Sequence, residues 1–172
     1  MFDPAKFDPK IYDVPLMLDA PFLLKTLLET FWNENLDDPS VASIKWSFRG
    51  TGFDENACYP QIVLEETPQL PCKIENVTED IIKVTHPVLL TVHVRPVKYT
   101  EDVIDATRAT FRNMMLAVTE VLRREKDEVD NVITVLPSDW KIDIDMTVEP
   151  VVFKASMAVT LVYYRSGLEW SA

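Results

Sequence analysis

Glycine is scarce in this chain, which has three glycines, Gly50, Gly52 and Gly167, among 172 residues. An average protein has about 7% glycine. Loops that cradle phosphate groups need glycine because their backbone amides must come close to the ligand. Three scattered glycines are too few for a P-loop or a dinucleotide-binding fingerprint, and the sequence therefore argues against both kinds of nucleotide site.

Cysteine and histidine are also rare, with two of each: Cys58, Cys72, His86 and His93. There is no CxxC pair and no zinc-binding spacing. Two cysteines could form one disulfide, but nothing requires it, and we expect free thiols in a reducing compartment. His86 and His93 are seven residues apart on a predicted strand, so they should face opposite sides and form no joint metal site unless a bulge intervenes. We expect each to be a surface or edge histidine.

Positive charge and long apolar runs are lacking as well. The net charge is -11, from 17 Lys and Arg against 28 Asp and Glu. Such a protein is repelled by nucleic-acid phosphates and by anionic membranes, which argues against a DNA-binding role. An acidic wall would nevertheless suit a pore through which DNA passes without being bound. No apolar run approaches the ~20 residues that span a bilayer, and the first residues do not resemble a secretory signal. We expect a soluble protein.

The length suits one domain, and the content of 47% apolar and 26% charged residues is typical of globular proteins. We expect an extended N-terminal arm at residues 1–18, a single domain at 19–166 and a C-terminal tail at 167–172.

The arm repeats a short pattern, Phe-Asp-Pro, at residues 2–4 and 7–9. Asp-Pro steps favour extended or turn structure over helix. The aromatic residues of the arm, Phe2, Phe7 and Tyr12, need a dry place to pack. Two interpretations stay open: the arm packs on its own domain or stays mobile, or it lies on a neighbouring subunit and locks it.

Two helices are predicted by capping residues and apolar spacing. Asp19 can cap a helix that begins with Ala20 and Pro21 and should end near Leu36. Thr100 can cap a longer helix over residues 101–125, with acidic residues at its start and arginines near its end, which complements the helix dipole.

Alternating apolar residues predict strands, which fall at residues 44–49, 61–65, 88–95, 140–148 and 153–163. A shorter run at 81–84 should pair too, with Pro87 as a bulge or a sheet edge. Residues 67–72 read as a loop. Because the strands do not alternate with helices, we predict an α+β fold: a mainly antiparallel or mixed sheet with two α-helices packed on one face.

The sequence contains no recognisable catalytic motif. Asp143 and Asp145 share a strand face and could hold a cation, but the alternation with Lys141, Thr147 and Glu149 is typical of the solvated side of a strand. There is no Gly-x-Ser-x-Gly elbow, and no activating partner for Cys58 is evident. We predict a non-enzyme with no metal and no cofactor.

The second helix has a basic side that includes Arg108 and Arg112, with Asp105 and Glu120 interspersed. It is either a solvated, salt-bridged face or part of a subunit interface. Because exposed arginines and aromatics favour interfaces, our candidate interface residues are Phe2, Phe7, Tyr12, Arg108, Arg112 and Trp170.

The order of elements resembles a known family. It comprises a Leu-rich helix at 22–36, Trp46-Ser47-Phe48-Arg49-Gly50, Tyr59-Pro60-Gln61-Ile62-Val63-Leu64, the strand at 88–95, the long helix directly after it, and a closing pair of strands. This layout, over residues 19–165, resembles the tail terminator proteins of long-tailed bacteriophages and related viruses, also called minor tail or tail-completion proteins. It is a likeness of layout and carries no sharp motif.

The resemblance implies a homo-oligomeric ring, commonly a hexamer, at the head-facing end of the tail tube. Such a ring binds the tail tube protein, stops its polymerisation and offers a docking face to head connector or neck proteins, while DNA passes through the lumen without specific binding. The location implied is the virion, after synthesis in the host cytoplasm. The family brings no catalytic residues.

Three alternatives stay open. The first is a head–tail joining or adaptor protein of the neck, with a larger ring. The second, from a different class, is a small ligand-binding domain or enzyme with a pocket between sheet and helices. The third is a structural protein of a bacterial contractile injection device. The number of subunits separates the first from a terminator, and a monomer with a polar pocket would favour the second.

Overall fold

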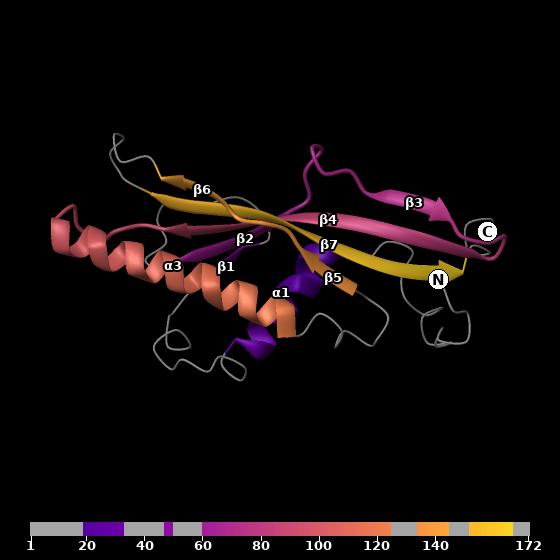
Figure 1. Cartoon of the computed structure of the whole chain (residues 1–172), viewed down its shortest axis with the longest axis horizontal. Helices are drawn as coiled ribbons and strands as arrows, with labels where there is room; N and C mark the ends of the chain where they lie inside the picture. The colour runs from indigo at the N-terminus through magenta and orange to yellow at the C-terminus, as the bar shows by residue number, and fades with distance from the viewer. Residues whose placement is uncertain (1–18, 33–46, 50–59, 125–133, 145–151, 167–172) are drawn as a thin grey trace.

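The computed structural model describes five stretches of the chain: residues 19–32, 47–49, 60–124, 134–144 and 152–166 (Figure 1). The predicted arm and tail lie outside these residues, and so do the candidate interface residues Phe2, Phe7, Tyr12 and Trp170. Within the described part, no helix is long and apolar enough to cross a membrane.

The described residues form an α+β fold, as predicted. Its sheet has the strand order β1-β2-β4-β7-β5, with β3 also paired to β4 and β6 also paired to β7. The strands are β1 (Ser47–Arg49), β2 (Gln61–Glu65), β3 (Lys73–Asn76), β4 (Ile81–Val94), β5 (Thr134–Pro137), β6 (Lys141–Ile144) and β7 (Phe153–Ser166). β1 runs parallel to β2, and the other pairings are antiparallel.

Two helices, α1 (Ala20–Phe31) and α3 (Glu101–Arg124), contact each other and lie on one face of the sheet (Figure 1). α1 begins as predicted: the N–H of Phe22 donates to Asp19 Oδ1 over 3.2 Å, and proline occupies the first turn. Its buried side chains include Leu24, Leu28 and Trp32. The predicted extension to Leu36 lies outside the described residues.

The two longest strands, β4 and β7, pair along their whole length, from Ile81 opposite Ser166 to Val94 opposite Phe153. Alternate residues of β4 are buried against the helices, as the apolar alternation predicts. The runs at 81–84 and 88–95 are therefore one strand that contains Pro87. The register with β7 is unbroken at Pro87, which lies opposite Thr160, so the predicted bulge is absent from this pair.

The long helix α3 packs across the centre of the sheet. Phe111 of α3 and Phe153 of β7 are both buried, with ring centroids 5.7 Å apart. Trp140, just before β6, donates its indole N–H to Thr119 Oγ1 over 2.9 Å. This contact ties the β5–β6 connection to the helix layer.

Candidate functional site

One edge of the sheet is interrupted next to Pro87. β2 and β3 run in the same direction along the same side of β4, with Glu65 opposite Leu89 and Lys73 opposite Thr85. Between them, residues 66–72 leave the sheet opposite β4 residues 86–88. Proline offers no N–H to a neighbouring strand, which explains the break at this point. Pro87 thus occupies a local sheet edge, one of the two positions predicted for it.

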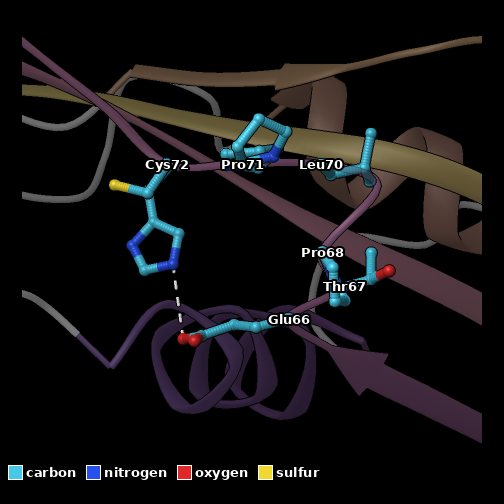
Figure 2. A pocket seen from close by; sticks show the side chains of 8 residues that line it. Glu66, Thr67, Pro68, Leu70, Pro71 and Cys72 are labelled. Carbon is cyan, nitrogen blue, oxygen red and sulfur yellow. Dashed lines mark ion pairs between the residues drawn. The ribbon is translucent and has the colours of Figure 1, made fainter.

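A pocket of about 290 Å³ lies under the loop that bridges this break (Figure 2). Its lining side chains come from the loop and from two residues of β4: Glu66, Thr67, Pro68, Leu70, Pro71, Cys72, His86 and Pro87. The volume is just below the ~300 Å³ lower limit that is usual for small-molecule sites. The sequence predicted the loop at 67–72 but gave no sign that it encloses a pocket.

A histidine–carboxylate pair spans the pocket. His86 Nε2 lies 3.3 Å from Glu66 Oε1, and the dashed line in Figure 2 marks this pair. The His86 side chain is 5% exposed, whereas Glu66 is 57% exposed. His86 Nδ1 is buried, with no hydrogen-bond partner in the described part of the chain. The pair ties the loop to β4, because Glu66 begins the loop and His86 belongs to the strand.

We predicted that His86 is a surface or edge histidine. The surface position is wrong, because the side chain is buried, but His86 does lie at the interrupted edge of β4, between the pairings of Leu89 with β2 and Thr85 with β3. His86 follows the alternation of Val84 and Val88, which are both fully buried on the helix side of the sheet. The strand period alone placed this histidine inward. Its burial is compatible with a polar ring because Glu66 supplies a partner from another strand end.

Cys72 lines the same pocket and is a free thiol. Burial, and then the charge of Glu66, raise the pKa of the Cys72 thiol above its ordinary value. The thiol form is therefore favoured over the nucleophilic thiolate. No group of three or more potential metal ligands occurs among the described residues. The raised pKa of Cys72 therefore does not favour a thiolate nucleophile in this pocket.

His93 faces the opposite side of the sheet from His86, as predicted. It is half-buried and lies opposite Gln61 on β2 and Lys154 on β7. Burial lowers the pKa of His93 from 6.5 to about 4, with a further lowering from Lys154 and an opposing effect of Glu65. The ring is neutral at neutral pH.

The two candidate interface arginines lie one turn apart on the same ridge of α3, where Arg108 is half-buried. Arg108 Nη1 is 3.6 Å from Asp105 Oδ1 in the same helix, so this residue fits the salt-bridged interpretation. Arg112 is exposed one turn further along. Leu116, another turn on, is 62% exposed, which gives the ridge an apolar member that the sequence analysis did not single out.

Two short edge strands are further candidates for a contact surface, and the sequence analysis missed one of them. All four residues of β3 are exposed, and so are Lys141, Ile142 and Asp143 of β6. Asp143 thus lies on a solvated strand, as predicted, and Asp145 is outside the described residues.

No known family model matches this chain, and a search of curated proteins finds no similar sequence.

Proposed function

We propose that the protein is a structural subunit of a virion that assembles with copies of itself into a closed ring. In this proposal the ring is a tail terminator, which caps the tail tube and joins it to the head connector. The observation that carries it is the element order α1, strands, α3, long closing strand, with both helices on one face of a largely antiparallel sheet. This is the layout whose sequence pattern resembles the terminator family.

The surface chemistry supports an assembly role. Within the described residues, β3 and β6 each pair with one strand and present their other edge outward. Unpaired edges promote association, and a ring closed by head-to-tail contacts buries them. The net charge of -11 suits a lumen wall through which DNA slides without being held. The role needs no catalytic residue and no cofactor.

The partners of the ring follow from its position in the particle. Copies of this chain form the ring, the tail tube protein binds one face, and a head connector or neck protein binds the other. Assembly takes place in the host cytoplasm, and the final location is the virion. The exposed ridge of α3, with Arg112 and Leu116, is a candidate surface for these contacts.

Light scattering after size exclusion, at several protein and salt concentrations, tests the proposal. A mass near six times the 19.7 kDa of one chain supports the terminator. A mass near twelve times that value would instead favour a neck adaptor. A monomer under every condition would count against any ring and favour a small ligand-binding domain, for which the pocket beside His86 is the place to search.

A further inference from the structure

We propose that β3 of one copy pairs antiparallel with β6 of the next copy, with Ile74 opposite Ile142, so that one sheet continues from subunit to subunit. The occupant of each free edge is therefore a second copy of this chain. The inference rests on the proposed function, because it names the contact that would close the ring.

The two edge strands occupy opposite corners of the sheet. β3 flanks β4 at Ile82 to Thr85, and β6 flanks β7 at Phe153 to Ser156. Because β4 and β7 pair with each other along their whole length, β3 and β6 lie on opposite sides of this central pair. They also lie toward opposite ends of it, as Figure 1 shows. In the described part of the chain no strand pairs with the outer edge of either. A head-to-tail contact needs two such different surfaces on one molecule.

The charges on the two edges match in this register. β3 reads Lys73-Ile74-Glu75 and β6 reads Lys141-Ile142-Asp143. Antiparallel pairing with the isoleucines opposed sets Lys73 against Asp143 and Glu75 against Lys141. All four charged residues are exposed, and opposite charges directly across a strand pair are stabilising.

The exposed isoleucines match as well. Ile74 lies opposite Val84, and Ile142 lies opposite Ala155, so both point to the helix side of the sheet, where Val84 and Ala155 are buried. Ile74 is 40% exposed and Ile142 is 58% exposed. The proposed register places them side by side and removes apolar surface from water.

Strand direction also agrees with a ring. β3 is antiparallel to β4, β4 to β7 and β7 to β6, so β3 and β6 of one copy run in opposite directions. An antiparallel contact between β3 and the next copy's β6 therefore leaves every copy pointing the same way, with its helices on the same side. A rotational ring requires this, whereas a parallel contact would invert alternate copies.

The register fixes the offset between neighbours. One row across the sheets joins Tyr164, Lys83 and Glu75 to Lys141 and Ser156 of the next copy. Tyr164 and Ser156 are eight residues apart on β7, so each copy is displaced along the strands by about 27 Å. The four spacings between the five strands of this row amount to about 19 Å sideways. The strands would thus cross the ring axis obliquely, as strands do in closed barrels.

A two-fold contact between two β3 strands is the competing arrangement. It would set Lys73 of each copy opposite Glu75 of the other, and the two Ile74 side chains opposite each other. The charges would be complementary in this contact too. We favour the head-to-tail contact because one kind of interface then covers both β3 and β6, whereas the two-fold contact leaves β6 unpaired.

Charge exchange on β3 separates the two arrangements. The double substitution Lys73→Glu with Glu75→Lys puts like charges against both Asp143 and Lys141, yet it keeps a β3–β3 contact complementary. We expect the concentration at which half of the chains are assembled to rise at least about tenfold. Adding Lys141→Glu and Asp143→Lys should restore assembly to within about threefold of the original. Unchanged far-UV circular dichroism and urea midpoints of both variants control for folding.

Cross-linking gives an independent measurement. In a background with Cys58→Ser and Cys72→Ser, a chain with Ile74→Cys is mixed with a chain with Ile142→Cys and oxidised. We expect disulfide-linked dimers in the mixture and none from either chain alone. Dimers from the Ile74→Cys chain alone would show the two-fold contact and overturn the proposal.

The outcomes distinguish the inference from the proposed function. If the unsubstituted chain forms a ring and the β3 exchange leaves its assembly unchanged, the ring stands and the β3–β6 contact is overturned. If the unsubstituted chain is monomeric under every condition, the β3–β6 contact is overturned, and the result counts against the proposed function in favour of a ligand-binding domain or enzyme. Loss of assembly on exchange, followed by recovery in the fourfold variant, supports both.

Discussion

His93 should make the stability of the protein depend on pH between about 6.5 and 4. Above pH 6.5 the ring is neutral in both the folded and the unfolded chain, so it has no effect. As the pH falls, the unfolded chain binds a proton that the folded chain does not bind, because burial and Lys154 lower the pKa in the fold. The protein therefore loses stability as the pH falls below about 6.5, and this loss reaches its full size below about pH 4.

The size of the effect follows from the two pKa values. A pKa of 6.5 unfolded and about 4 folded corresponds to about 2 kcal/mol of lost stability at pH 5. The ring is only half-buried, and solvent screens part of this interaction. We therefore expect about 1 kcal/mol at pH 5.

Urea denaturation of the original chain and of a His93→Gln variant, at one protein concentration and several pH values from 7.5 to 4, measures it. The difference between the two free energies of unfolding isolates His93, because every other titrating group is common to both chains. A Lys154→Gln control should reduce the pH dependence only in part, since burial is the larger cause. If the free energies of unfolding of the two chains change with pH in parallel, the reasoning is refuted. If the original chain gains stability relative to His93→Gln at low pH, the attraction of Glu65 for the protonated ring dominates.

Three further predictions concern core packing, one side-chain hydrogen bond and a helix cap. Leu90→Ala, at a fully buried position, should cost about 2–5 kcal/mol of unfolding free energy, whereas Leu116→Ala should cost less than about 0.5 kcal/mol; similar urea midpoints would contradict this. Trp140→Phe removes the hydrogen bond to Thr119 and should lower the free energy of unfolding by about 1 kcal/mol. In a double-mutant cycle, Trp140→Phe combined with Thr119→Val should cost less than the sum of the two single substitutions, because both remove the same hydrogen bond. Asp19→Ala should cost about 1 kcal/mol in thermal unfolding, with Asp19→Asn as the near-neutral control.

The elements that could be predicted from sequence are those with strong local signals. The buried faces of β4 and β7 follow a period of two, and α1 has a capping aspartate and a leucine stripe, so each is visible within a few residues. β3 has a single apolar residue among four exposed ones, and it is a strand only because it pairs with β4. The position of β4 beside this segment is set by the whole fold, and the local sequence of β3 carries no information about it.

The pocket illustrates the same limit for the site. The period of β4 already pointed His86 inward, although we expected a surface or edge position. What permits its burial is Glu66, which comes from the end of another strand. The pairing that brings Glu66 to His86 is set by the register of β2 on β4, and no spacing in the sequence specifies that register.

A single proline accounts for two features that would otherwise seem unrelated. Because Pro87 offers no N–H, the strand beside β4 is interrupted there, and the chain bridges the break with the loop over the pocket. The same interruption leaves β3 as a separate four-residue strand at the far corner of the sheet. Short, charged edge strands resist indiscriminate pairing. A short edge that accepts only a partner of matching charge order can direct assembly of copies without promoting aggregation, which is the property a closing ring requires.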